Sequence, residues 1–340
     1  MKKQKTIIIV LFVSMGICSA SAQDITATER SEVIDNIVDQ LTKRYVDPNL
    51  GQEAAETIKQ KKEKHAYDAL NTQAALIETL IADMHAATGD KQLQLKNKSG
   101  AGTEWIHPAL TIKPSNGTNL DDPQFKKKIL QWINYGLPAQ VQEGNIGNLG
   151  ILEFFSPEIA PEVYQAIDKA MKSLQECTAV ILDLRQCGRG GDPEVMMYLA
   201  SYFLGGEESQ PLYMSFNREN QKIAEFRTRT DITGRRLPNV PLYILVSSET
   251  FSTGEMFAYG LQKADRAKVI GETSAGAAHV TDTIDIGHGM MMVLPVNRLA
   301  HVRTKTNWEG TGVIPDVPAK AEEALDVAKD IIQKARRNAK

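Results

Sequence analysis

The sequence predicts an α/β fold with a mainly parallel sheet, preceded by a small helical cap at the N-terminal end. Two observations carry this prediction. From about residue 144 onward, short apolar runs alternate with amphipathic stretches of helical period, which is the order expected of βαβ units. Before that point, residues 29–87 carry apolar side chains at helical spacing in successive stretches.

Residues 1–22 have the pattern of a secretory signal peptide. Lysines at the start are followed by an apolar stretch, 6–17, and by the small residues Ala20, Ser21 and Ala22, which form a cleavage site. The apolar stretch is too short to span a bilayer comfortably. We therefore expect an exported protein, periplasmic or secreted, with no stable membrane insertion once the leader is cleaved.

We assign residues 23–95 to an N-terminal domain of three helices. The first is amphipathic and ends before Pro48, because proline disfavours helix in the residue that precedes it. The second, 52–65, is strongly charged, and its lysine-rich part is expected to be a solvated face. The third has an apolar stripe within residues 76–84.

Residues 96–143 are expected to connect this domain to the core, with one short strand near 109–112. Residues 144–320 form the predicted core, and 321–340 a C-terminal helix. We expect core strands at 150–155, 179–183, 242–246 and 267–271, separated by helices at 161–174, 195–203 and 254–264. The strand at 242–246 is apolar on both faces, as is expected of a buried parallel strand.

Ser252 lies between the strand at 242–246 and the helix that begins near Gly254. A serine at such an elbow is where α/β hydrolases display a nucleophile, because the backbone N–H groups that follow point outward and unpaired. Ser252 is therefore the candidate nucleophile. The ordinary alternative is a helix N-cap, the usual role of a serine at this position.

A second strand, 179–183, runs into a loop that contains Gly188, Gly190 and Gly191. Glycines allow the backbone to approach a ligand closely. Such a loop could equally lie under a phosphate, but no GxGxxG or GxxxxGK[ST] pattern is present, which disfavours a nucleotide site.

Together these segments resemble the tail-specific, or C-terminal processing, serine peptidases. The resemblance is closest to the branch without a PDZ domain that is related to interphotoreceptor retinoid-binding protein and the tricorn core. The matching segments are DLRQCGRGGDPE (183–194), SSETFSTGEMFAYGLQ (247–262), RAKVIGET (266–273) and TNWEGTGVIPDVP (306–318). The resemblance implies a ClpP/crotonase-like core with Ser252 as the nucleophile and with Gly190 and Thr253 as oxyanion donors.

A serine hydroxyl needs a base that takes its proton. The resemblance places a lysine at the position of Ala277 in the processing proteases and a histidine at the position of Gln92 in the tricorn-like branch. Neither alanine nor glutamine accepts a proton. His279, two residues beyond Ala277, is the substitute base that we predict, and His85 is a second possibility. The ordinary alternative for either histidine is a structural or surface role.

Glu309 fits the glutamate of the tricorn-like set, which orients the serine and histidine; its alternative is a carboxylate bonded to N–H groups of its own loop. Asp183, Arg185 and Asp316 are expected to be structural, because buried charges at strand ends usually pair. No cofactor is expected. No metal site is predicted either, since HExxH, CxxC and clusters of ligand spacing are absent from the sequence.

We therefore predict an exported serine-type endopeptidase that hydrolyses bonds in extended or unfolded polypeptide through Ser252. The alternative is a catalytically silent relative that binds a peptide or an apolar ligand in the same cleft, which Gln92 and Ala277 favour. The net charge of -3 argues against a general nucleic-acid binder. Cys177 and Cys187 flank one predicted strand and are expected to be free.

Overall fold

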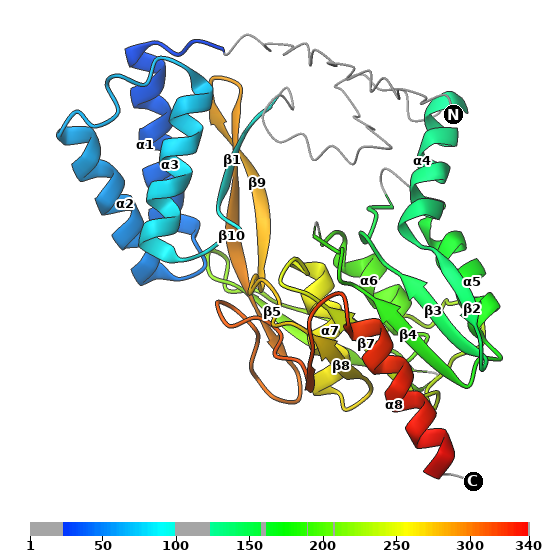
Figure 1. The fold of residues 1–340 in the computed structure, drawn as a ribbon. Helices are drawn as coiled ribbons and strands as arrows, with labels where there is room; N and C mark the ends of the chain where they lie inside the picture. The colour runs from blue at the N-terminus through cyan, green and yellow to red at the C-terminus, as the bar shows by residue number, and fades with distance from the viewer. Residues whose placement is uncertain (1–22, 99–122, 158–160, 189, 207, 339–340) are drawn as a thin grey trace, which may run out of the picture.

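The computed structural model describes residues 23–98, 123–157, 161–188, 190–206 and 208–338. In Figure 1, three helices stand at one side of the molecule, and a long β-hairpin joins them to an α/β core. The predicted signal peptide, 1–22, and the strand expected near 109–112 lie outside the described residues.

The helical cap consists of α1 (Ala27–Arg44), α2 (Pro48–Glu63) and α3 (Gln73–Thr88). Local sequence explains where these helices begin. Thr26 and Glu29 form a capping box at the start of α1. Asp47 accepts hydrogen bonds from the first turn of α2, and Pro48 supplies the preset backbone angle of a first helical residue.

The apolar face of α1 (Val33, Ile34, Ile37 and Leu41) is fully buried, as the periodicity predicts. It packs in one cluster with residues of β10 (Met290–His301), among them Met290, Met292, Leu294 and Val296. The cap is therefore fixed to a sheet rather than standing as an independent bundle.

The core is a 6-stranded sheet in the order β11-β8-β7-β4-β3-β2. Its strands are β2 (Ala139–Gln142), β3 (Ile146–Gly150), β4 (Ala179–Asp183), β7 (Leu242–Val246), β8 (Lys268–Gly271) and β11 (Val317–Pro318). All neighbours are parallel except β2 and β3. The predicted mainly parallel core is confirmed, although β3 ends where the strand expected at 150–155 was to begin. Phe154 makes only an isolated bridge to Gly191.

A second, antiparallel sheet was not predicted. It contains β1 (Gln94–Asn97), β5 (Pro211–Asn217), β6 (Ile223–Arg227), β9 (His279–Gly287) and β10. β9 pairs with β10, and Ile286 is its single buried residue, so it lacks the apolar run that marks the core strands. The complete fold is thus mixed, with one mainly parallel and one antiparallel sheet.

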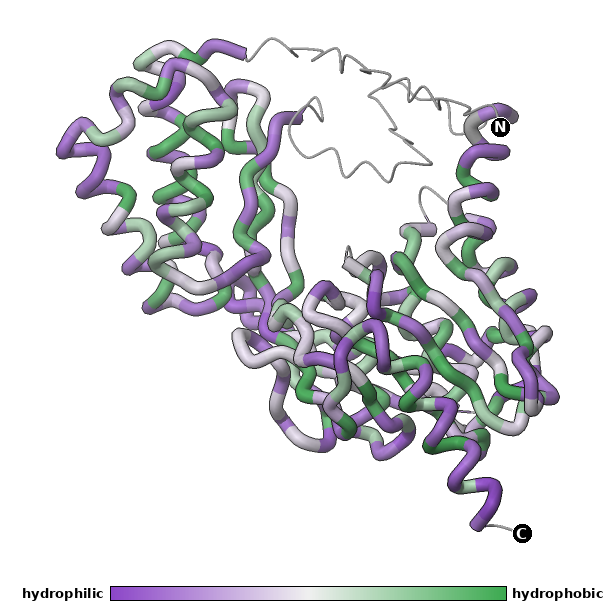
Figure 2. Tube along the Cα trace, in the orientation of Figure 1, coloured by the Kyte–Doolittle hydropathy of each residue, from purple (hydrophilic) through white to green (hydrophobic). Residues whose placement is uncertain are grey.

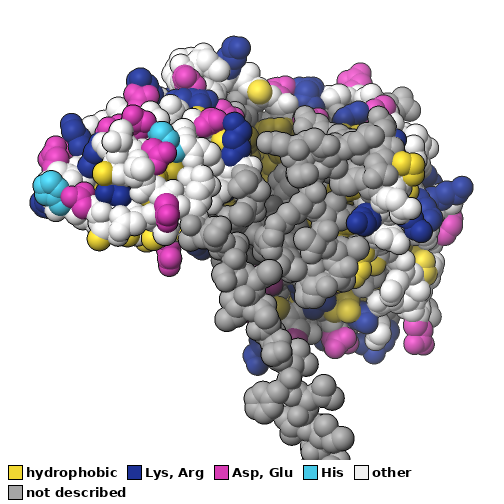
Figure 3. Space-filling model, turned by 90° about the horizontal axis from the view of Figure 1, so that it is seen from above, with side chains coloured by type: hydrophobic (Ala, Val, Ile, Leu, Met, Phe, Trp, Pro, Cys, Tyr) yellow, Lys and Arg dark blue, Asp and Glu magenta, His cyan; other side chains and the backbone are white. Residues whose placement is uncertain are grey.

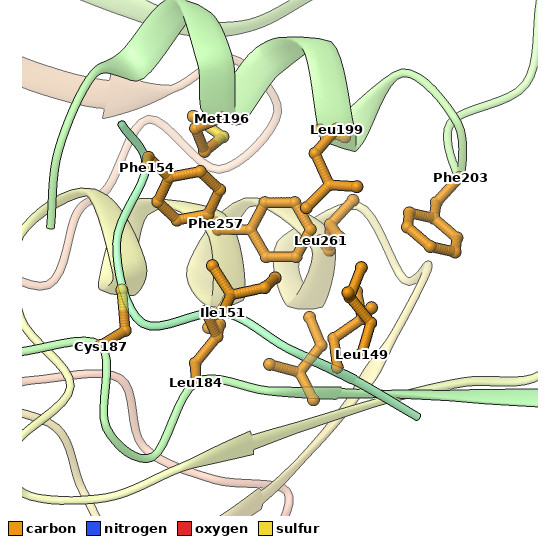
Figure 4. Packing of buried hydrophobic residues seen from close by; sticks show 14 of the residues in the cluster. Leu149, Ile151, Phe154, Leu184, Cys187, Met196, Leu199, Phe203, Phe257 and Leu261 are labelled. Carbon is orange, nitrogen blue, oxygen red and sulfur yellow. The ribbon is translucent and has the colours of Figure 1, made fainter. Parts of the chain in front are cut away.

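The helices of the core are α4 (Pro123–Gly136), α5 (Val163–Leu174), α6 (Pro193–Ala200), α7 (Thr253–Lys263) and α8 (Ala324–Asn338). Figure 4 shows side chains of α6 and α7 meeting above the sheet, where Met196, Leu199, Phe257 and Leu261 are buried. α4 was not predicted; it falls in the segment expected to be a connection. The packing of α7 in this core holds its N-terminal end, and with it Ser252, in place.

Hydropathy along the chain follows this arrangement, with the green, hydrophobic residues of Figure 2 concentrated in the central strands. In Figure 3, Lys and Arg side chains are interspersed with Asp and Glu over the helical cap. Among the described residues, no helix combines the length and the hydrophobicity needed to cross a bilayer. Cys177 and Cys187 are both buried and free, as expected.

Candidate active site

Ser252 occupies the elbow between β7 and α7, immediately before the first residue of the helix. Its backbone has φ 51° and ψ -116°. A positive φ is unfavourable for a residue with a side chain and costs on the order of 1 kcal/mol or more. The surrounding packing imposes this conformation, as is common where a chain displays a reactive side chain.

Glu255 fastens the elbow to the loop that precedes β9. Its buried carboxylate accepts the Ser252 N–H at 2.9 Å, the Ser274 hydroxyl at 2.6 Å, and the backbone N–H groups of Gly276 and Ala277 at 2.6 and 2.9 Å. Burial raises the pKa of Glu255, and these hydrogen bonds oppose that rise. The sequence analysis missed this residue, although the S-x-x-E spacing from Ser252 was a visible signal.

The two predicted oxyanion donors lie beside Ser252, the candidate nucleophile. A Cβ atom added at Gly190 would stand 2.8 Å from Ser252 Cβ and 2.8 Å from the Thr253 nitrogen, so these backbones are in direct contact. Within the described residues, the Thr253 N–H has no hydrogen-bond partner. The Gly190 N–H interacts with the thiol of Cys187, whose pKa burial raises to about 12.

Gln92 lies next to Ser252, with 3.5 Å between its Nε2 atom and the Ser252 hydroxyl oxygen. The same amide holds the first residue of β9: Nε2 donates to the His279 carbonyl at 2.8 Å, and Oε1 accepts the His279 N–H at 2.7 Å. Gln92, the position at which the resemblance places a histidine, is thus beside Ser252. A neutral amide occupies it in this chain.

Ala277 and His85, two further candidates from the sequence, supply no base. Ala277 is buried, its N–H is bonded to Glu255, and its carbonyl accepts the indole N–H of Trp308 at 3.1 Å. His85 bonds through Nε2 to the Leu93 carbonyl at 2.7 Å, a structural role within the cap.

His279 is the histidine that the fold brings to the site. Its Nδ1 atom lies 2.9 Å from Asp90 Oδ2 and 3.5 Å from Glu309 Oε2. Burial alone would lower the pKa of His279, but the hydrogen bond to Asp90 and the charges of Glu309 and Asp90 outweigh it and raise the pKa above its ordinary value.

The two carboxylates beside His279 differ from each other. Burial would raise the pKa of Asp90, but the hydrogen bonds from His279, the Gln92 N–H and the Tyr45 hydroxyl outweigh it, so that the pKa is lowered. For Glu309 burial prevails and its pKa is raised. Asp90 was not predicted as a site residue; it lies two positions before Gln92, where the resemblance places a histidine, and this closeness was the available signal.

A cavity of about 160 Å³ opens beside these residues. Gln92, Ser252 and His279 form part of its polar wall, and Met256, Leu299 and Trp308 part of its apolar wall. Ser252 and His279 face the same cavity, but no hydrogen bond joins them in the described part of the chain. The arrangement offers a hydroxyl, a carboxylate-bonded imidazole and an outward N–H around one small space.

Comparison with known proteins identifies the family of the chain. A sequence model of peptidase family S41 matches residues 145–319, just over half of the chain. A carboxy-terminal-processing protease of Bartonella bacilliformis is 24% identical over 259 residues, covering 73% of this chain and 56% of the relative.

Solved structures show the same fold. A lipoprotein from Streptococcus agalactiae matches with a TM-score of 0.55 at 14% identity, over 92% of this chain and 98% of that one. The photosystem II D1 C-terminal processing protease matches with a TM-score of 0.54 at 15% identity, over 88% and 94% of the two chains. The chain spans about half the length of the curated relatives it matches.

Proposed function

The chain belongs to peptidase family S41, and on that premise we propose that it is a serine-type endopeptidase with Ser252 as the nucleophile and His279 as the base. The observation that carries the proposal is the strained backbone of Ser252, held at a strand-to-helix elbow beside an imidazole that is hydrogen-bonded to a carboxylate. A positive φ at a serine needs a reason, and display of the hydroxyl into the cavity provides one.

The reaction proposed is acyl transfer. The Ser252 oxygen attacks the carbonyl carbon of a peptide bond while its proton passes to His279 through one water in the cavity, since general bases act directly or through one water. The negative oxygen of the tetrahedral intermediate accepts a hydrogen bond from the Thr253 N–H. It accepts a second one from the Gly190 N–H, once that group turns away from the Cys187 thiol. His279 then protonates the leaving amine, and water hydrolyses the acyl-enzyme.

Asp90 and Glu309 have a positioning role in this proposal. The hydrogen bond from His279 Nδ1 to Asp90 fixes the imidazole so that its other nitrogen is the one available as a base. Glu309 is itself held by the Ala278 N–H at 2.6 Å, so it is a fixed rather than a mobile charge.

For the substrate we propose extended or unfolded polypeptide with a small apolar side chain next to the cleaved bond. The cavity is small, and Met256, Leu299 and Trp308 give it an apolar wall. We also propose that the protein is exported and that residues 1–22 are its signal peptide. N-terminal sequencing of the mature protein checks this point, because it should begin at Gln23, and a chain that retains Met1 would contradict export by this leader.

A fluorophosphonate probe tests the proposed activity, because it labels serines that are activated for nucleophilic attack. We expect stoichiometric labelling of the wild-type protein on Ser252, located by peptide mapping, and none in Ser252→Ala. His279→Ala should slow labelling nearly as much, because nucleophile and base act as one unit. Far-ultraviolet circular dichroism of each variant serves as the folding control. Folded wild-type protein that is not labelled would support the silent, ligand-binding alternative instead.

A further inference from the structure

Two carboxylates face a single imidazole nitrogen in this site. His279 Nδ1 lies 2.9 Å from Asp90 Oδ2 and 3.5 Å from Glu309 Oε2. The three atoms lie within 4.8 Å of one another. They come from the loop after α3, from the first residue of β9 and from the loop after β10, so only the tertiary fold unites them.

Orientation of a catalytic imidazole needs one carboxylate, and this site has two. A single Nδ1–H is directed well toward one acceptor only, and Asp90 takes it at the shorter distance. The second carboxylate, Glu309, then adds a negative charge that is largely shielded from water. Asp90 is 2% exposed, and the side chain of Glu309 is 24% exposed. Burial of like charges is costly unless a cation or a proton lies between them.

The spacing suits a zinc ion. Zinc bonds to nitrogen and oxygen measure about 2.0–2.2 Å, so neighbouring ligand atoms of a tetrahedral site stand roughly 3.3–3.5 Å apart. The distances of 2.9 and 3.5 Å from His279 Nδ1 lie around that value. Imidazole together with carboxylate favours zinc or a similar transition metal over calcium and magnesium, which prefer oxygen ligands alone.

Outer contacts also hold the candidate ligands in place. The Tyr45 hydroxyl donates to Asp90 Oδ2 at 2.9 Å, the Gln92 N–H donates to Asp90 Oδ1 at 2.8 Å, and the Ala278 N–H donates to Glu309 Oε2 at 2.6 Å. Hydrogen bonds of this kind orient the ligands of metal sites in general.

We propose that Asp90, His279 and Glu309 bind one zinc ion through three protein ligands, with the fourth position left to water. Zinc binds Nδ1, and the hydrogen that the neutral imidazole holds there moves to Nε2. The two carboxylates balance the charge of the ion. The consequence for activity rests on the proposed function: an imidazole that has zinc on one nitrogen and hydrogen on the other has no lone pair for the Ser252 proton. Zinc is therefore an inhibitor of the peptidase.

The test begins with the mature wild-type chain, stripped of metal with a chelator and equilibrated by dialysis against zinc. We expect one zinc per chain by elemental analysis. Titration calorimetry measures the affinity. Asp90→Asn and Glu309→Gln should each weaken zinc binding by at least about 10-fold, the loss typical even of residues that only orient metal ligands. Circular dichroism checks that each variant is folded.

His288 offers a matched control. It also contacts two carboxylates, Glu32 at 2.7 Å and Glu29 at 3.5 Å, but through different ring nitrogens and at the surface of the cap. His288→Ala should keep the full zinc stoichiometry and affinity. If zinc binding is lost in His288→Ala and kept in Asp90→Asn and Glu309→Gln, the ion binds at the surface and the inference is wrong. Absence of stoichiometric zinc from folded wild-type protein would overturn it as well.

Fluorophosphonate labelling with and without zinc separates this inference from the proposed function. If zinc suppresses labelling of the wild type but not of Glu309→Gln, the result supports both the peptidase and the zinc site. Labelling without any zinc binding leaves the peptidase proposal standing and removes the zinc site. Zinc binding at the three residues without labelling supports the metal site and removes the peptidase proposal.

Discussion

The Gln92 side chain pairs with both backbone groups of His279, its Oε1 accepting the N–H at 2.7 Å and its Nε2 donating to the carbonyl at 2.8 Å. A residue of a neighbouring strand would make the same pair of contacts. Gln92 thus fixes the first residue of β9 through its backbone while the His279 side chain reaches Asp90. The glutamine that stands at a base position has a different task, which is to position the histidine that we propose as the base.

Substitution of Ser252 should separate nucleophilic from conformational effects. Both Ser252→Ala and Ser252→Gly should abolish labelling and any peptidase activity. Because φ at this position is 51°, glycine should be more stable here than alanine by about 1 kcal/mol. Urea denaturation measures the difference. Equal stability of the two variants would show that the elbow relaxes and is not held in a strained form.

The glycine-rich loop allows a paired comparison. A Cβ atom at Gly190 would lie 2.8 Å from Ser252 Cβ, at a φ of 69°, whereas one at Gly188 would meet no heavy atom nearer than 3.5 Å. Gly190→Ala should therefore lower the labelling rate by about 100-fold or more, since the oxyanion site is displaced, and Gly188→Ala should leave it within about 3-fold. Equal effects of the two substitutions would place the oxyanion site elsewhere.

The pH dependence of the labelling rate should report His279. A base acts when it is deprotonated, and the pKa of His279 is raised above its ordinary value, so the rate should rise with pH to a midpoint above about 6.5. Asp90→Asn removes both a hydrogen bond and a charge that raise this pKa, so the midpoint should move to lower pH. A midpoint that stays unchanged in this variant would indicate that another group titrates.

The same raised pKa has a consequence for stability, with a sign that can be worked out. Protonated His279 paired with carboxylates stabilises the folded state fully below the pKa of the unfolded chain, and this contribution is lost as the pH rises through the folded pKa. Asp90, whose folded pKa is lowered, contributes in the opposite direction: its stabilisation is lost as the pH falls through that pKa.

His301 should make the fold sensitive to acid. It is 1% exposed, and burial lowers its pKa to about 4, with the nearby charges of Arg303 and Lys263 acting in the same direction. The unfolded chain takes up a proton below about pH 6.5 while the folded chain does not, so stability falls between these pH values, by about 3 kcal/mol. His301→Phe, among the rings of Tyr213 and Tyr259, should remove this loss in urea denaturation at several pH values.

His65→Ala is the control for that measurement, because the His65 side chain is 80% exposed. It should leave the acid side of the stability profile as it is in the wild type. If His301→Phe keeps the full acid sensitivity, the destabilisation arises from the carboxylates of the molecule rather than from His301.

The parts of the fold that were predictable are those whose sequence signal is local. β4 and β7 are apolar on both faces, and their observed bounds equal the predicted ones because burial on both sides leaves a continuous run. β9 has one side in solvent and carries threonine and aspartate, so no such run marks it. α4 and β2 fell in a stretch whose composition indicated a connection.

The site divides in the same way. Ser252 and Gly190 could be proposed from the sequence because an elbow and a glycine-rich loop have local signatures. Asp90 and Glu255 were missed, because each is important only through partners that the fold supplies: Asp90 bonds to a residue 189 positions away, and Glu255 to a loop 21 positions away. The S-x-x-E spacing that marks Glu255 indicates a helix cap, but it does not reveal the bonds of Glu255 to the loop before β9.

The last prediction concerns an exchange of the base between two positions. His279→Ala should reduce the labelling rate to near that of Ser252→Ala, since no other base touches the cavity among the described residues that line it. In that background, Gln92→His places an imidazole where Gln92 Nε2 now lies 3.5 Å from the Ser252 oxygen. We expect the double variant to regain at least about 10-fold in rate, the lower range of general-base contributions.

Gln92→Asn in the same background is the control and should regain nothing. Recovery in the histidine variant alone would show that the elbow, the oxyanion site and the cavity are competent and that the base can act from either position. No recovery in a folded double variant, together with unimpaired labelling of His279→Ala, would mean that neither position supplies the base.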